Sequence, residues 1–482
     1  MSHALSGLEP KLLWDHFAAL AAIPRGSKNE AAATTHVVAF AARLGLPAKV
    51  DSVGNVVITK PGTPGLETKP PIVLQGHLDM VCEKNSGTVH DFTKDPIRLV
   101  VNGDEVKADG TTLGADNGIG CAAALALLES NDVAHPPLEC LFTIDEETGM
   151  TGANALTQAF LNGSRMLNLD TEEEGAIYVG CAGGVDTVAS TKVARVAPAA
   201  GAVAVRIAVT GLRGGHSGCD IHEGRVNALK VLPRAVSEAE ACGFAVATLD
   251  GGSKRNAIAR EGFAAGWLLP AREADVKAAL AKLEADVRSE AGRFDNPVNV
   301  GLERVDAAPG PMAPADAKRI VGFMHAAPHG VLGWSPDIPG LVQTSTNLAI
   351  VETKGDEVSF ATSQRSSVDS AKKDAGRQMA TAMELAGLTV TQGDGYPGWK
   401  PNVSSPILGV AKTVHAELFG REPEVKAIHA GLECGIIGEK FPGMDTISFG
   451  PTIRNAHSPD ECVSIPSVAN FWKYLTALLP RM

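Results

Sequence analysis

Three strongly apolar segments in the first part of the chain each end on acidic or histidine residues. They are PIVLQGHLDM (71–80), LECLFTIDEE (138–147) and RMLNLDTEE (165–173), and helical patterns occur at 30–45 and 118–130. Apolar strands that alternate with helices favour a largely parallel sheet with both faces covered. Ligands of such sheets bind beyond the carboxyl ends of the strands. We therefore expect the ionisable residues at these ends to gather on one edge of the sheet.

The pattern changes near residue 185 and returns after the turn-rich segment GDGYPGWKPN at 393–402. Between these points, strands and long charged helices form two comparable sets, which is typical of an α+β domain with two similar halves. We predict an α/β fold whose first domain, with a mostly parallel central sheet flanked by helices, consists of residues 1–184 and 396–482. Residues 185–395 are predicted to form an inserted α+β domain.

Composition excludes several classes of protein. The chain has 482 residues, 44% of them hydrophobic, and a formal net charge of −12, which argues against nucleic acid or an anionic membrane as a partner. No segment approaches the about 18 consecutive apolar residues of a membrane span. The start of the chain lacks a signal-peptide pattern, and the eight cysteines contain no CxxC pair. Both features favour a cytoplasmic location with reduced thiols.

Five groups of metal-ligand type lie at predicted strand ends or in loops next to them. Each alone has an ordinary explanation, such as a helix cap for an aspartate before a helix or a solvated pair for adjacent glutamates. Together they are the residues His77 with Asp79, Asp116 in GADNG, Glu146 and Glu147, Asp170, and His457. Converging carboxylates repel one another unless cations neutralise them. Two imidazoles and three carboxylates suit two divalent ions about 3.5–4 Å apart that share one carboxylate. Zinc fits such nitrogen and oxygen ligands best, and Mn²⁺ or Co²⁺ are expected substitutes.

The same motifs, in the same order, resemble those of the cocatalytic-zinc peptidases that include carboxypeptidase G, aminoacylase and tripeptidase. The resemblance extends over the whole chain. The segments GHLDMV, LGADNGIG and GCAGG are most similar to the bacterial aminoacyl-histidine dipeptidases, which cleave beta-alanyl-histidine (carnosine) and other dipeptides. By this resemblance the first domain is the catalytic domain, and the inserted domain is a lid that also forms a homodimer.

The resemblance also implies a role for each residue of the set. Asp116 bridges two zinc ions, His77 and Asp170 complete one site, and Glu147 and His457 complete the other. Asp79 holds the ring of His77 through its second nitrogen, and Glu146 is the general base. An aspartate at position 170 is typical of the aminopeptidase- and dipeptidase-like members.

In the predicted lid, the resemblance points to three substrate-binding residues. His216 matches a histidine that donates a hydrogen bond to the oxyanion in the partner subunit's site. Asn256 and Arg365 resemble groups that bind the terminal carboxylate of the substrate, for which arginine is suited by bidentate pairing. Arg255 and Arg260 are competing candidates for this last role.

The predicted function is hydrolysis of dipeptides by a cytosolic dinuclear zinc metallopeptidase. The ammonium group of the substrate is expected to meet Asp116 or Glu147, with Glu172 or Glu173 behind it. The nearest alternatives are an N-acyl amino acid amidohydrolase and a tripeptidase on the same scaffold. A binding protein without catalysis is disfavoured, because such a protein is expected to lack Glu146 or a ligand, and this chain has them all.

Overall fold

The computed structural model describes residues 3–292 and 298–482. The chain divides into two compact units. The first extends to Gly180 and resumes over Pro401–Ala427 and Leu432–Met482, and the second comprises Cys181–Lys400 and Ile428–Gly431. The transitions lie at 180/181 and 400/401, whereas the sequence placed them at 184/185 and 395/396.

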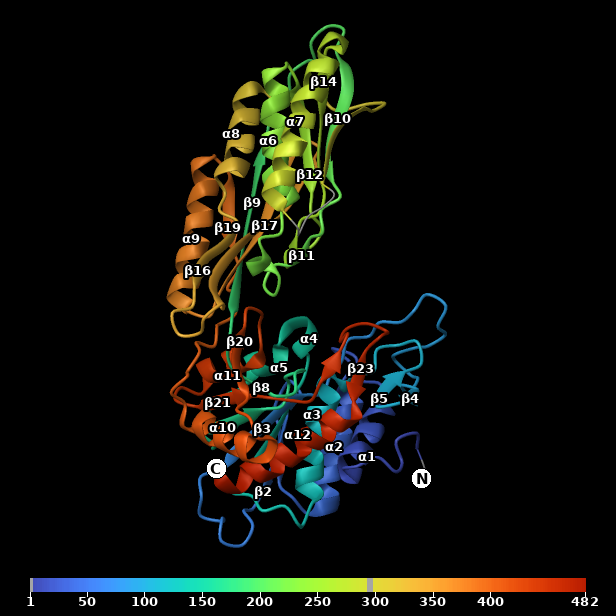
Figure 1. The fold of residues 1–482 in the computed structure, drawn as a ribbon, viewed down its shortest axis with the longest axis vertical. Coiled ribbons are helices and arrows are strands. Elements are labelled where there is room, and N and C mark those ends of the chain that lie inside the picture. The colour runs from blue at the N-terminus through green and yellow to red at the C-terminus, as the bar shows by residue number, and fades with distance from the viewer. Residues whose placement is uncertain (1–2, 293–297) are drawn as a thin grey trace. The chain divides into compact units, whose positions relative to one another are not determined.

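Helices and strands alternate in the first unit (Figure 1). Its helices are α1 (Lys11–Ala21), α2 (Ala31–Leu44), α3 (Ala115–Glu129), α4 (Glu146–Gly149), α5 (Thr151–Ala155), α10 (Pro406–Phe419), α11 (Glu433–Lys440) and α12 (Ile465–Leu478). Its main sheet is formed by β1 (Ala48–Val50), β2 (Val56–Lys60), β3 (Ile72–His77), β6 (Leu138–Thr143), β7 (Arg165–Asn168), β8 (Ala176–Cys181), β20 (Glu424–Ile428) and β21 (Asp445–Ser448). A smaller sheet contains β4 (Leu99–Asn102), β5 (Glu105–Ala108), β22 (Ile453–Arg454) and β23 (Cys462–Ser464).

The main sheet has the strand order β1-β2-β6-β3-β7-β21-β8-β20. Its four central strands, β6, β3, β7 and β21, are parallel to one another, and β1, β2 and β8 pair antiparallel toward the edges. Every residue of β3 and β6 is buried, as expected for strands covered on both faces. The predicted α/β fold with a parallel-containing central sheet is confirmed.

Helix α3 packs against the sheet at short range because its sequence is rich in small residues. A Cβ on Gly120 would lie 2.5 Å from the carbonyl oxygen of Leu169, and one on Gly76 of β3 would lie 2.2 Å from Oδ1 of Asn117. Larger side chains at these positions would push the helix away from the strand ends. The small residues therefore bring the start of α3, which carries Asp116, next to His77.

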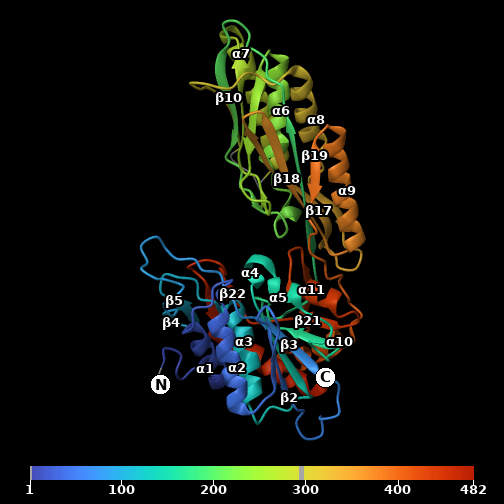
Figure 2. The same ribbon diagram turned by 180° about the vertical axis from the view of Figure 1, so that it is seen from behind.

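Over its described residues, the second unit contains one large sheet and four long helices (Figure 2). The helices are α6 (Ala228–Ala241), α7 (Glu273–Ala291), α8 (Pro314–Ala326) and α9 (Asp369–Leu385). The strands are β9 (Gly183–Lys192), β10 (Val203–Thr210), β12 (Ala245–Gly251), β14 (Gly262–Leu268), β15 (Asn299–Arg304), β16 (Gly330–Trp334), β17 (Val342–Lys354), β18 (Glu357–Ser366) and β19 (Thr389–Gln392), with the small pair β11 (Gly215–His216) and β13 (Ala257–Ile258).

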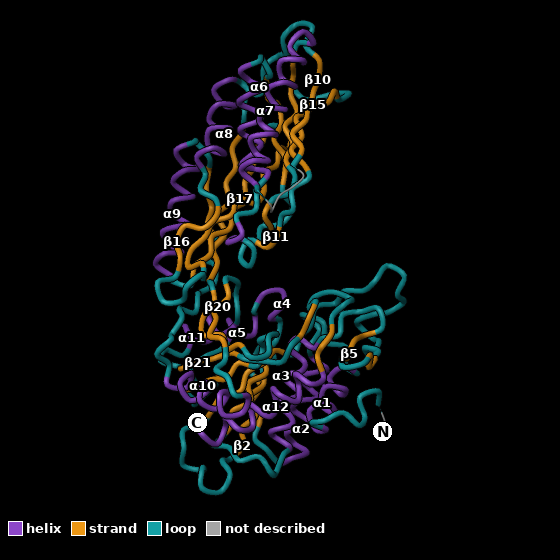
Figure 3. Tube along the Cα trace, viewed as in Figure 1, coloured by secondary structure: helices purple, strands orange, loops and turns teal. Residues whose placement is uncertain are grey.

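Both sets of elements predicted for this region contribute to the same sheet, whose order is β15-β10-β14-β12-β17-β18-β9-β19 with β16 paired to β17. The helices lie along one face of the sheet (Figures 2 and 3). Alternate residues of β14 are buried, as expected when only one face packs on a core. That core includes Leu229, Leu232, Phe323, Phe360 and Met379. Among the described residues, no helix is both long and apolar enough to cross a membrane.

Candidate active site

The structure brings the predicted strand-end residues of the first unit together. His77 ends β3, Asp116 lies at the start of α3, and Asp170 follows β7 by two residues. Nε2 of His77 lies 3.1 Å from Oδ1 of Asp116 and 3.2 Å from Oδ1 of Asp170. These three side chains form one compact group of potential ligand atoms.

A second group shares Asp116 with the first. Nε2 of His457 lies 3.2 Å from Oδ2 of Asp116 and 3.0 Å from Oε2 of Glu147. Each oxygen of the Asp116 carboxylate therefore faces a different imidazole. His457 has a left-handed backbone (φ 63°), a conformation that costs energy for a residue with a side chain and that is often retained at functional sites.

Asp79 connects the histidine to the acidic segment. Its Oδ1 lies 3.3 Å from Nδ1 of His77 and accepts a 3.0 Å hydrogen bond from the main-chain N–H of Glu146. Its Oδ2 accepts from Ser27 Oγ and from the N–H of Glu147. Asp79 thus leaves Nε2 of His77 directed at Asp116 and Asp170, and it fixes the backbone that carries both glutamates.

Burial and neighbouring charges shift the pKa values of this cluster. Burial opposes a charge on His77, but the surrounding carboxylates raise the pKa of its imidazole well above the usual range. Burial raises the pKa of Asp170 to about 7, against the opposing effect of His77. Hydrogen bonds to Asp116 and Glu147 raise the pKa of His457 to about 11. The raised pKa values mean that these side chains hold protons tightly, because the crowded carboxylates favour a nearby positive charge.

Glu146 begins α4 beside these groups. Burial raises the pKa of its carboxyl well above the usual range, and the charges of Asp170, Glu433 and Glu147 add to this effect while His77 opposes it. A carboxylate with a raised pKa is a stronger proton acceptor, which suits a general base.

The residues present fit a pair of divalent cations. Oε1 of Glu147 is buried and has no hydrogen-bond partner among the described residues, although a buried carboxylate oxygen is costly to leave unpaired. Two imidazole nitrogens and three carboxylates are a ligand set that zinc prefers. Divalent ions would supply positive charge in place of these protons, because metal ions and protons compete for the same ligand atoms.

Two buried groups that the sequence analysis missed hold the Asp116 loop. The carboxylate of Glu461 accepts the main-chain N–H groups of residues 113–116 at 2.8 to 3.3 Å. The guanidinium of Arg25 donates to the carbonyl oxygens of Leu78, Asp79 and Gly114. Neither position stands out in the sequence, because each acts on main-chain atoms far away along the chain.

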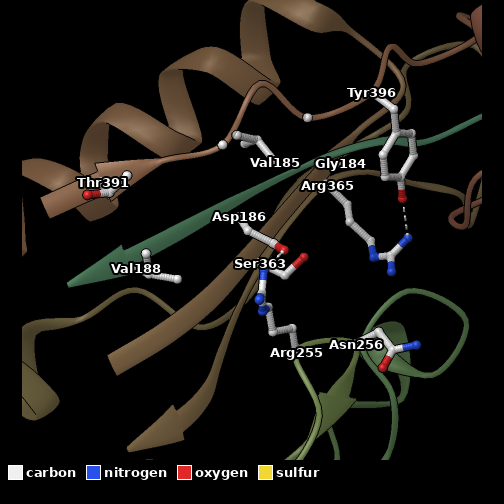
Figure 4. Close-up of a pocket in the computed structure, with 12 residues that line it drawn as sticks. Gly184, Val185, Asp186, Val188, Arg255, Asn256, Ser363, Arg365, Thr391 and Tyr396 are labelled. Atoms are coloured by element: carbon white, nitrogen blue, oxygen red, sulfur yellow. Dashed lines mark hydrogen bonds and ion pairs between the residues drawn. The ribbon is translucent and has the colours of Figure 1, made fainter. Parts of the chain in front are cut away.

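In the second unit, Asn256 and Arg365 line one cavity of about 630 Å³ (Figure 4). Arg365 is buried on β18, and its Nη1 donates a 3.0 Å hydrogen bond to Tyr396 Oη. Arg255 lines the same cavity but forms an ion pair with Asp186 at 2.8 Å. Arg260 lines a different cavity.

His216 lies next to Asn256, because β11 pairs with β13 and the N–H of Ser217 donates to the carbonyl oxygen of Asn256. Nδ1 of His216 accepts the main-chain N–H groups of Gly218 and Cys219. Burial, with a contribution from Arg365, lowers the pKa of His216 to about 4. The ring is therefore neutral at pH 7, and its proton lies on Nε2.

Comparison with known proteins agrees with this geometry. The model of the peptidase family M20/M25/M40 matches residues 73–481. The cytosol non-specific dipeptidase of Escherichia coli (strain K12) is 41% identical over 480 residues, which cover 99% of each chain. The crystal structure of aminoacylhistidine dipeptidase from Vibrio alginolyticus matches with a TM-score of 0.91 and 41% identity, over 99% of this chain and 98% of that one.

A tripeptidase from Staphylococcus aureus shares the fold at 16% identity, with a TM-score of 0.60 and coverage of 98% of both chains. The family match, the identity over almost the full length and the acidic cluster with its two histidines all agree. This chain therefore belongs to the peptidase family M20/M25/M40, a family of hydrolases that use a metal cofactor.

Proposed function

We propose that this chain is a dinuclear zinc dipeptidase that cleaves dipeptides, including Xaa-His dipeptides such as beta-alanyl-histidine. The observation that carries the proposal is the Asp116 carboxylate, whose two oxygens face His77 on one side and His457 on the other. The names of the two 41% identical relatives, a non-specific dipeptidase and an aminoacylhistidine dipeptidase, support this substrate class.

In this proposal, His77 and Asp170 would hold one zinc ion, Glu147 and His457 would hold the other, and Asp116 would contribute to both sites. Asp79 orients the ring of His77. Such ions supply Lewis acidity, which polarises the substrate carbonyl and makes water a better nucleophile at neutral pH.

Glu146 is the proposed general base. Its carboxylate takes a proton from the attacking water and delivers it to the nitrogen of the leaving amine. The raised pKa of Glu146 supports this role, since the carboxyl has to hold the proton between the two steps.

Residues of the second unit are proposed to bind polar groups of the substrate. Arg365, with Asn256 on the same cavity wall, is suited to the substrate carboxylate because its guanidinium is buried and its Nε has no hydrogen-bond partner among the described residues. Arg255 is a weaker candidate because Asp186 already neutralises it. The Nε2–H of neutral His216 is suited to donate to a developing oxyanion.

Glu172 is the proposed partner of the substrate ammonium group. Of the three consecutive glutamates, Glu173 pairs with Lys426 at 2.6 Å and Glu174 accepts a hydrogen bond from Asn470. Glu172 instead lies against Asp116, and burial raises its pKa to about 8. A half-buried carboxyl beside the proposed metal ligands is suited to recognise a free amine.

We further propose a cytoplasmic location, in line with the name of the Escherichia coli relative, and a homodimer. An N-acyl amino acid amidohydrolase and a tripeptidase remain the alternatives on this scaffold.

A substrate panel tests the proposal. Zinc-loaded protein should cleave beta-alanyl-histidine and other free-amine dipeptides, and it should be inactive on the N-acetylated forms of the same dipeptides. Glu172→Gln should raise KM for the free-amine substrates, whereas the matched control Glu174→Gln should not. Hydrolysis restricted to acylated substrates or to tripeptides would contradict the dipeptidase assignment.

A further inference from the structure

A row of buried polar side chains crosses the main sheet of the first unit just below the acidic cluster. These residues lie on the adjacent parallel strands β6, β3, β7 and β21, and each is at most 1% exposed: Thr143, Gln75, Asn168 and Ser448. Gln75 precedes His77 by two residues, and Asn168 precedes Asp170 by two. Gln75 and Asn168 therefore lie on the same side of their strands as His77 and Asp170.

Hydrogen bonds join the row without interruption. Ser448 Oγ donates to Oδ1 of Asn168 at 2.5 Å, and Nδ2 of Asn168 donates to Oε1 of Gln75 at 2.5 Å. Nε2 of Gln75 then donates to Oε2 of Glu433 at 2.6 Å, and Thr143 Oγ1 donates to the same oxygen at 2.6 Å. Asn168 also accepts the N–H of Asp170 at 3.3 Å, which links the row to the cluster above it.

Glu433, the first residue of α11, is the ionisable member of this network. It is 0% exposed, and its Oε1 has no hydrogen-bond partner among the described residues. Burial raises its pKa to about 7, and its charge in turn raises the pKa of Glu146. A buried carboxyl costs more free energy than an apolar side chain of the same size, so stability alone does not explain a glutamate here.

We propose that Glu433 is a positioning residue for the metal centre, which acts through Gln75 and Thr143 to fix the strand ends carrying His77 and the Glu146–Glu147 segment. The inference rests on the proposed function, since it assumes that these strand ends hold metal ions. Partners behind the ligands of a metal set their orientation, and losing one typically weakens metal binding about 10–100-fold.

Glu139 offers a matched control. It is also a buried carboxylate, 3% exposed, on the same strand as Thr143, but near the opposite end of β6. It accepts hydrogen bonds from the N–H groups of Asn162 and Gly163, far from the acidic cluster along the strand. Replacing Glu139 should lower the stability of the protein without changing the positions of the proposed metal ligands.

The test compares zinc affinity, measured by competition with a chromophoric chelator, in Glu433→Leu, Glu433→Gln and Glu139→Leu. Glu433→Leu removes the carboxylate oxygen that accepts the short hydrogen bonds from Gln75 and Thr143, and it should weaken zinc binding about 10–100-fold. Glu433→Gln keeps an acceptor oxygen and should restore most of this affinity. Glu139→Leu should lower the unfolding temperature and leave zinc affinity unchanged. Wild-type affinity in Glu433→Leu, or equal weakening in Glu139→Leu, would overturn the proposal.

Thr143→Val covers the case in which Glu433→Leu does not fold. It removes a single hydroxyl donor from Glu433 and should weaken zinc binding about 3–10-fold. Unchanged affinity in this variant would also overturn the proposal. Failure of the proposed function has a different outcome, because the wild-type protein itself would then not bind zinc.

Discussion

The acidic cluster of the first unit and the polar groups of the second unit differ in charge and in the direction of their pKa shifts. In the first, carboxylates from separate strand ends are crowded around two histidines, and burial raises the pKa of Asp170 to about 7. In the second, Arg365 is buried on β18, and burial lowers the pKa values of two histidines of the same unit, His216 on β11 and His429 after β20. The proposed function assigns cations to the first region and an anionic or neutral polar group to the second.

The difference also concerns how the side chains are held. Main-chain hydrogen bonds from residues 113–116 to Glu461, and from Glu146 and Glu147 to Asp79, fix the predicted ligands of the first unit through their backbone. Arg365 in the second unit is held by a side-chain contact, the hydrogen bond to Tyr396. We expect changes in the first region to affect metal binding and turnover, and changes in the second to affect mainly substrate affinity.

The largest expected effect follows from removing the shared carboxylate. Asp116→Ala should lose both metal ions and reduce kcat/KM on the order of 10⁴-fold or more, because Lewis-acid catalysis contributes several kcal/mol. Metal analysis and steady-state kinetics on the same preparation measure both effects. A variant that keeps two ions per chain would show that Asp116 does not bridge them.

Glu146→Ala separates catalysis from metal binding. Loss of a general base should reduce kcat about 10²–10⁴-fold while the metal content stays at the wild-type value. Near-normal kcat in the metal-loaded variant would place the base elsewhere, and loss of metal would make Glu146 a ligand instead.

Two arginines of the second unit provide a matched pair. Arg365→Ala should reduce kcat/KM about 10–100-fold, mainly through KM, because a charge-assisted hydrogen bond to the substrate is lost. Arg255→Ala removes a half-exposed ion pair with Asp186 and should change kcat/KM less than about 3-fold. The reverse ranking would assign the substrate carboxylate to Arg255.

The smallest predicted effect concerns how the stability of each unit depends on pH. In chelator-treated protein, we expect this dependence to differ between the two units. The folded-state pKa values of Asp170 and Glu433 are raised to about 7, so the folded first unit binds more protons than the unfolded chain between pH 5 and 7. Its stability should therefore fall as the pH rises through this window. The lowered pKa values of His216 and His429, about 4 and 3, have the opposite sign, so the stability of the second unit should rise up to about pH 6.5.

Calorimetric scans at pH 5 and pH 7 measure both effects. Each of these ionisable groups changes the free energy of unfolding by up to about 1.4 kcal/mol per pH unit. Such a change corresponds to a shift of a few degrees in the unfolding temperature. We expect the two unfolding transitions to move in opposite directions, and zinc should reverse the shift of the first unit. Transitions that move together would contradict the distinction between the units.

The sequence was informative where strand periodicity and chemistry coincide. The apolar segments that end at His77, Glu147 and Asp170 predicted both the parallel sheet and the cluster, because the carboxyl ends of parallel strands meet at one edge. The buried polar row below the cluster is also partly visible in the sequence, because Gln75 and Asn168 are single polar residues within apolar segments.

Other features could not be predicted from local patterns. Arg25, Glu433 and Glu461 act through hydrogen bonds to groups far away in the sequence, and no periodicity marks such positions. In the second unit, the insertion of β9 between β18 and β19 depends on non-local antiparallel pairing. The residues of its cavity were identified through the family resemblance, because an arginine on a strand has many ordinary roles.

Anomalous diffraction at the zinc absorption edge, from crystals grown with zinc, tests the central claim most directly. We predict two peaks per chain that flank the Asp116 carboxylate, one within bonding distance of His77 and Asp170 and the other of Glu147 and His457. A single peak, or peaks away from these five side chains, would contradict the account.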